Sequence, residues 1–119
     1  MRNTIIVAGI FCVLGLACRP VLPPVDSRLL DPNGAFTLYV SNQSFAITPV
    51  DITVAIDGEV VVREYFEVGN QHSWKKFTLT IPNGRHTVNV ASRKGGATLT
   101  KEIEVTGRHW AVTDFWYYP

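Results

Sequence analysis

The sequence contains few cysteines and almost no excess charge. Its 119 residues include two cysteines, and 11 Lys plus Arg stand against 10 Asp plus Glu. Binding to nucleic-acid phosphates requires a basic patch, which a formal charge of +1 does not supply. Charged residues make up 18% of the chain and apolar residues 46%, which excludes an intrinsically disordered protein. We therefore expect one small globular domain and no nucleic-acid partner.

Residues 1–17 have the layout of a secretory signal peptide. Arg2 precedes an apolar run of about 14 residues, which is shorter than the roughly 20 that a membrane-spanning helix needs. The run ends in Leu14-Gly15-Leu16-Ala17-Cys18, and this ending resembles the lipobox of bacterial lipoproteins. The alternative is an ordinary secretory peptide that is cut close to Cys18.

The lipobox resemblance implies that residues 1–17 are removed and that Cys18 carries a diacylglycerol on its sulfur. The membrane is then a partner through this lipid. Arg19 stands where the family has the Asp that retains enteric lipoproteins on the inner membrane, so the resemblance implies the outer membrane, facing the periplasm, as the location. Cys12 lies in the removed segment, so the mature chain has no pair of cysteines for a disulfide. The mature domain must therefore be held together by its core.

The remaining chain divides into a tether and a domain. Residues 18–34 contain four prolines among small and polar residues, which disfavours both helix and central strand. Residues 35–119 alternate apolar and polar side chains with a period of two and contain no helical pattern. We expect about seven strands in an all-β antiparallel sandwich. The predicted strands span residues 36–41, 50–57, 59–66, 74–81, 85–92, 97–105 and 109–118.

Turn residues support this division. Asp57-Gly58 predicts a tight hairpin, and Pro82-Asn83-Gly84 predicts a turn before the segment Gly84-Arg85-His86-Thr87-Val88-Asn89-Val90. Residues 54–60 and 79–90 resemble PEGA-type and related immunoglobulin-like or transthyretin-like envelope domains. The resemblance implies a compact scaffold and brings no catalytic residues with it.

The sequence contains no catalytic or metal-binding motif. His72, His86 and His109 are spaced unlike any set of metal ligands, and we expect His86 to be a strand-end residue that is hydrogen-bonded to a turn. Glu102 and Glu104 lie about 7 Å apart on one face of a strand, which favours a solvated face over a glycosidase pair. We therefore predict that the protein is not an enzyme and uses no metal or cofactor.

The segment from His109 to Tyr118 is the most aromatic part of the chain. One interpretation is a central sandwich strand that buries Trp110 and folds its last residues over an open end of the core. The other is an aromatic platform that stacks on sugars or fills pockets of a partner protein. The candidate binding residues are Trp110, Phe115, Trp116, Tyr117 and Tyr118. Three further aromatic residues extend either arrangement: Tyr39, Tyr65 and Trp74.

Two functional hypotheses follow from these features. The first is a lipid-anchored, non-enzymatic accessory or adaptor protein of the bacterial cell envelope, with another envelope protein as its partner. The alternative is a glycan-binding module for peptidoglycan or surface polysaccharide. A sheet face that exposes two aromatic side chains in one plane favours glycan binding, whereas burial of the aromatic residues excludes it.

Overall fold

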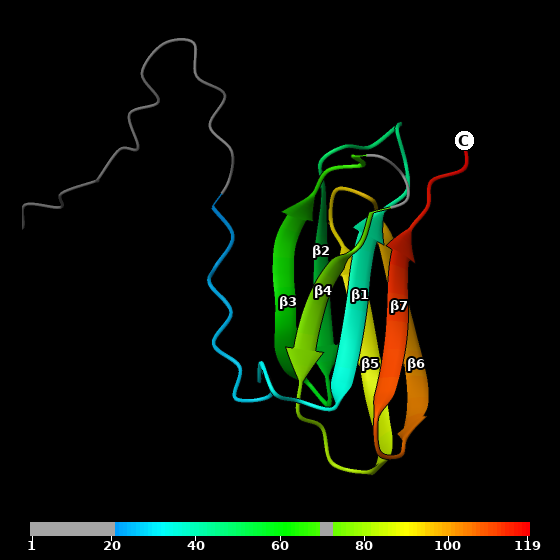
Figure 1. Cartoon of the computed structure of the whole chain (residues 1–119). Helices are drawn as coiled ribbons and strands as arrows, with labels where there is room; N and C mark the ends of the chain where they lie inside the picture. The colour runs from blue at the N-terminus through cyan, green and yellow to red at the C-terminus, as the bar shows by residue number, and fades with distance from the viewer. Residues whose placement is uncertain (1–20, 70–72) are drawn as a thin grey trace, which may run out of the picture.

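The computed structural model describes residues 21–69 and 73–119, and within these residues the regular structure consists of strands alone. The four-stranded sheet has the order β3-β2-β5-β6 and the three-stranded sheet has the order β4-β1-β7 (Figure 1). The strands are β1 (Phe36–Asn42), β2 (Val50–Ile56), β3 (Glu59–Phe66), β4 (Lys75–Leu79), β5 (Gly84–Ser92), β6 (Ala97–Val105) and β7 (His109–Phe115). The predicted all-β sandwich of seven strands is confirmed. The proposed signal peptide and Cys18 lie outside the described residues.

Strand pairing defines how the two sheets are built. All pairs are antiparallel except β1 with β7, which run parallel. An immunoglobulin constant domain places its first, second, fourth and fifth strands in one sheet, whereas here β1 and β2 lie in different sheets. The strand order therefore differs from that of an immunoglobulin constant domain. None of the described residues forms a helix that is long and apolar enough to span a membrane.

The core lies between the two sheets and follows from the alternating pattern. The apolar residues of β1 and β2 that share one parity are at most 2% exposed: Phe36, Leu38, Val40, Val50, Ile52, Val54 and Ile56. A register shift in the pairing of β2 with β3 leaves Val61 without an opposite residue, and both Val61 and Val62 are buried. Each such side chain stabilises the fold by about 1.5–3 kcal/mol relative to an exposed one.

The predicted hairpin at Asp57-Gly58 is also confirmed. These two residues connect β2 to β3 with φ of 50° and 81°, the left-handed conformation that a type I′ turn requires. Gly58 adopts this conformation without a steric penalty, and Asp tolerates it better than most other residues. The turn fixes the pairing of Ile56 with Glu59.

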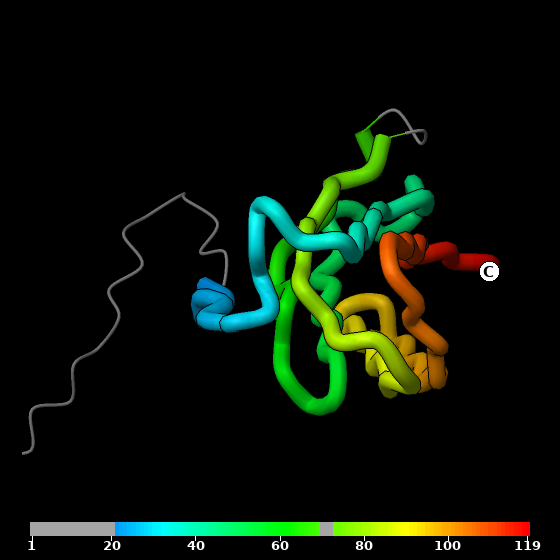
Figure 2. Tube along the Cα trace, turned by 60° about the horizontal axis from the view of Figure 1, so that its bottom comes forward, coloured from blue at the N-terminus to red at the C-terminus, as the bar shows by residue number. Residues whose placement is uncertain are grey.

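The segment before β1 covers one edge of the three-stranded sheet. Leu30 forms an isolated bridge with Leu79 of β4, and the Thr80 N–H donates to the carbonyl of Leu29 at 2.8 Å. Gly34 lies so close to this strand that a Cβ at that position would overlap the carbonyl oxygen of Leu79. The last part of the proline-rich segment therefore belongs to the folded domain. It lies on the opposite side of the domain from the residues that follow β7 (Figure 2).

Candidate functional site

The direction of the side chains of β7 is set by its pairing with β1. Leu38 pairs with Ala111 and Val40 pairs with Thr113, and Leu38 and Val40 face the core. Ala111 and Thr113 therefore face inward, while Trp110 points outward and is 67% exposed. The interpretation of this segment as a central strand that buries Trp110 is wrong, because β7 lies at the edge of its sheet and the register points small residues inward.

Aromatic side chains from three places in the chain meet on the outer face of the three-stranded sheet. Tyr39 comes from β1, Trp74 precedes β4, and Trp110 and Val112 come from β7. These four side chains, called the aromatic face below, line a shallow depression of about 410 Å³. Trp74 is 43% exposed and Val112 is 46% exposed. The platform interpretation therefore gains two members, Tyr39 and Trp74, from outside the C-terminal segment.

Asp114 holds one ring of this face in place. Its Oδ1 accepts a hydrogen bond from the Trp74 indole N–H at 2.7 Å and another from the Ser41 hydroxyl at 2.6 Å. The Gln43 amide in turn donates to the Ser41 hydroxyl at 2.7 Å. Trp74 thus reaches across β1 to β7, and the shared carboxylate orients its ring before any ligand arrives. A preorganised aromatic side chain loses less conformational freedom on binding.

The other predicted residues of the C-terminal segment have different positions. Phe115 is 8% exposed and packs at the end of the core, where its ring leaves no room for a side chain at Gly95. Trp116 and Tyr118 stack on each other with ring centroids 6.4 Å apart, and Tyr117 between them is 45% exposed. Phe115 is therefore a core residue, whereas the other four predicted residues are exposed. Tyr65 lies on β3 in the other sheet and does not join them.

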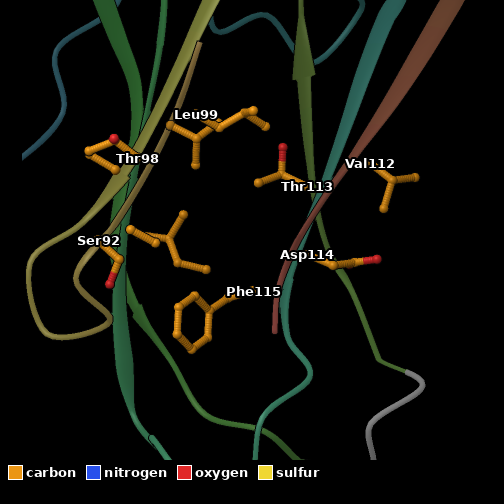
Figure 3. A pocket seen from close by; sticks show the side chains of 11 residues that line it. Ser92, Thr98, Leu99, Val112, Thr113, Asp114 and Phe115 are labelled. Atoms are coloured by element: carbon orange, nitrogen blue, oxygen red, sulfur yellow. The ribbon is translucent and has the colours of Figure 1, made fainter. Parts of the chain in front are cut away.

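A second concave region, called the β6–β7 seam below, lies between the edge strands of the two sheets. It contains a cavity of about 280 Å³, which is lined by Leu99 and Val90 on one side and by Thr113 and Phe115 on the other. A smaller cavity of about 80 Å³ continues it along the strands, past Lys101. Figure 3 shows Thr113 and Phe115 on the side of β7 that faces β6, with Val112 and Asp114 on the opposite side. Sequence reasoning did not predict this seam, although Lys101 interrupts the apolar alternation of β6.

His86 joins two turns at one end of the sandwich. Its Nδ1 lies 2.5 Å from the Asp57 carboxylate and its Nε2 lies 2.6 Å from the Pro82 carbonyl oxygen. Both partners accept hydrogen bonds, so the charged form of the imidazole, with a proton on each nitrogen, satisfies both contacts. The hydrogen bonds that His86 donates to Asp57 and Pro82 raise the pKa of His86, and the one to Asp57 lowers the pKa of that carboxyl group. The prediction of a strand-end histidine bonded to a turn is confirmed.

The described residues hold no cluster of three or more His, Cys, Asp or Glu side chains that could bind a metal ion. His109 stacks on Phe36 with ring centroids 6.1 Å apart, and His72 lies outside the described residues. Glu102 and Glu104 are exposed on β6, where Glu102 pairs with Arg85 at 3.7 Å.

Comparisons with known proteins returned no match for this chain among family models, curated proteins or solved structures. The resemblance of residues 54–60 and 79–90 to PEGA-type domains therefore stays a prediction. The described part of the chain presents two candidate interaction surfaces, the aromatic face and the β6–β7 seam.

Proposed function

We propose that this protein is a lipid-anchored, non-enzymatic accessory or adaptor protein of the bacterial cell envelope. The aromatic face is the observation that carries this proposal, because three aromatic side chains and Val112 are grouped on one face instead of being scattered. Contiguous exposed apolar patches mark interaction sites, whereas single exposed apolar residues are normal. Trp and Tyr are also the residues that most often dominate the binding energy of protein interfaces.

The anchor in this proposal is the lipid on Cys18. The lipobox-like residues 14–18 support it, and Arg19 after Cys18, in place of the Asp that retains lipoproteins on the inner membrane, supports attachment to the outer membrane on its periplasmic side. Residues 18–28 separate the lipid from the first pairing with β4, and a semi-extended chain of this kind advances about 3 Å per residue. The domain can therefore contact a partner a few tens of Å from the lipid surface.

Glycan binding is the second candidate, and one observation favours it. The indole ring of Trp74 is fixed by Asp114 beside Tyr39 and Trp110, so the aromatic face offers preoriented rings next to polar groups. Lys76 is the register partner of Tyr39 and is exposed. Sugars stack on aromatic rings while their hydroxyl groups form hydrogen bonds with polar neighbours.

Crosslinking in membranes tests the adaptor function. The lipidated protein and its Trp110→Ala variant are gently crosslinked in envelope membranes and then copurified. We expect one recurrent envelope protein with the wild type and a loss of at least tenfold with the variant. Phe45→Ala is the matched control, because Phe45 is an aromatic residue of similar exposure, 63%, that lies in the β1–β2 connection. Recovery of the wild type alone, at abundances where a partner should be seen, contradicts the proposal.

Tryptophan fluorescence tests the alternative. A panel of peptidoglycan and surface-polysaccharide fragments is titrated into the purified domain, and a glycan that stacks on the aromatic face must change the emission of Trp74 or Trp110. The same titration with Trp110→Ala must show a weakened response. If no fragment of the panel changes the tryptophan emission, the glycan-binding function is excluded and the adaptor function is unaffected.

A further inference from the structure

The free edge of β7 offers a row of unpaired backbone groups. The His109 N–H donates to the carbonyl of Ala35, and the Phe115 carbonyl accepts from Gln43 N–H, so the odd-numbered residues of β7 bond to β1. Backbone groups of alternate residues point to opposite edges of a strand. The N–H and C=O groups of Trp110, Val112 and Asp114 therefore point away from β1, and β7 pairs with no other strand among the described residues.

The interior beside this edge is incompletely filled. The cavities of about 280 Å³ and 80 Å³ run along the β6–β7 seam, and Leu99 at its rim is 58% exposed. Val88, Val90 and Ile103 face this side of the sandwich and are only partly buried. The other edge of the same sheet differs, because the segment around Leu30 covers β4. The three-stranded sheet thus has one covered edge, at β4, and one edge, at β7, that exposes backbone groups beside apolar interior.

Lys101 gives the seam its charge. It has the inward parity of β6, where Val88 is its register partner, and it lines the smaller cavity together with Ala111 and Thr113. Within residues 21–69 and 73–119 it forms no ion pair. An inward-pointing charge on an edge strand discourages unspecific pairing with other strands. It also favours an incoming segment that carries a carboxylate at the matching position.

We propose that the β6–β7 seam binds an extended segment of a partner protein, which adds a strand to the free edge of β7. Alternate side chains of this segment enter the seam; they are apolar except for one Asp or Glu that faces Lys101. Addition of a strand to an exposed sheet edge is an established mode of peptide recognition, with backbone hydrogen bonds for affinity and pockets for specificity. The inference goes beyond the proposed adaptor function, because it assigns the domain a second interaction surface and states the chemistry of the segment that binds there.

A second copy of this chain fits the seam poorly. If β7 paired with the β7 of another copy, it would supply the small side chains of Ala111 and Thr113 for the interior. The two β6 edges lie on the same side of the sandwich as β7, so their Lys101 side chains would approach each other. Two like charges that approach without counter-charges disfavour the pairing.

Amide hydrogen exchange with defined peptides tests this inference on the purified domain. The probe is a synthetic twelve-residue peptide in which Val and Ile alternate with Thr and Ser, with Glu at one central apolar position. The control is the same peptide with Lys at that position. We expect the Glu peptide to slow exchange of the Val112 and Asp114 amides at least tenfold. The Ala111 and Thr113 amides, already bonded to β1, should be protected with and without peptide.

Two variants make the test specific. Val112→Pro removes an N–H that points away from β1, so the fold should persist while binding of the peptide falls at least tenfold; the melting temperature checks the fold. Lys101→Glu should reverse the preference, so that the Lys peptide binds this variant better than the Glu peptide does.

The inference is overturned if exchange of the Val112 and Asp114 amides is unchanged at millimolar peptide, or if both peptides bind equally well. Lys101 would then serve only to discourage unspecific strand pairing at this edge. Because no membrane or cellular partner takes part, such a failure is distinct from failure of the crosslinking experiment. A protein partner on the aromatic face would still copurify.

Discussion

Replacement of His86 by Phe should weaken the domain in a manner that depends on pH. The Phe ring fills nearly the same space but cannot donate to Asp57 or Pro82, which lie 2.5 and 2.6 Å from the imidazole nitrogens. A hydrogen bond to a charged group contributes about 1.5–3 kcal/mol and a neutral one about 0.5–1.5 kcal/mol. The Asp57 side chain is 53% exposed and keeps its bond from the Thr87 N–H, so water offsets part of the loss. We expect the free energy of unfolding to fall by about 2 kcal/mol near pH 6.

The sign of the pH dependence follows from the direction of the pKa shifts. The pKa of His86 is raised above its ordinary 6.5 in the folded domain, so its contribution is complete below that value. It is lost as the pH rises through the raised pKa. The pKa of Asp57 is lowered, so its contribution is present above about 3.9 and disappears only in stronger acid. The difference between wild type and His86→Phe should therefore be greatest from pH 4.5 to 6 and shrink toward pH 9.

Urea unfolding from pH 4.5 to 9, monitored by tryptophan fluorescence, measures the difference in free energy of unfolding between wild type and His86→Phe. The double variant with Asp57→Asn is the control, because it separates the coupling of the two side chains from their separate effects. When Asp57 is already replaced by Asn, His86→Phe should lower the free energy of unfolding by less, and this loss should depend less on pH. A cost for His86→Phe that is the same at pH 5 and pH 9 would refute the reasoning.

Three further predictions concern other parts of the chain. Asp51→Asn should lower the free energy of unfolding by about 1–3 kcal/mol. Burial opposes ionisation of Asp51, but the hydrogen bonds that its carboxylate accepts from the β5–β6 turn outweigh burial and lower its pKa. Urea unfolding at a series of pH values should show this loss vanishing as the pH falls through the lowered pKa. Gly34→Ala should lower the free energy of unfolding by about 3 kcal/mol, because the added Cβ overlaps the backbone of β4. Gly58→Ala should lower it by only about 1–2 kcal/mol, because nothing lies within 4 Å of the added Cβ and only the left-handed backbone is unfavourable. Urea unfolding measures both losses, and equal losses would contradict the packing argument. Cys18→Ser should abolish incorporation of a metabolically supplied fatty acid, and continued labelling of that variant would refute the lipid anchor.

Local features of the fold were predictable from the sequence. The alternation from Val50 to Ile56 gave a buried strand, and Asp57-Gly58 gave its hairpin, because both depend on neighbouring residues alone. The boundaries of Glu59–Phe66 and Ala97–Val105 agree with the predicted strands for the same reason. Trp116, Tyr117 and Tyr118 are exposed, and their role in binding stays a prediction.

Long-range pairing was not predictable from local patterns. Consecutive strands β6 and β7 belong to different sheets, and β7 pairs in parallel with β1, about 70 residues earlier in the chain. Only this register shows that Ala111 faces the core while Trp110 faces outward. Tyr39, Trp74 and Trp110 lie together for the same reason, because the order of β4, β1 and β7 in the sheet cannot be read from any single segment. The β6–β7 seam depends on the same order, since it exists only because two edge strands from different sheets lie on one side.

Site-specific photocrosslinking tests the central claim most directly. A photoreactive phenylalanine analogue replaces Trp110 on the aromatic face, and in a separate variant it replaces Glu104, which is exposed on β6 of the other sheet. After irradiation of intact cells, an adaptor that uses the aromatic face gives one covalent product with an envelope protein from position 110 and none from position 104. No product from position 110, or the same products from both positions, would contradict the account.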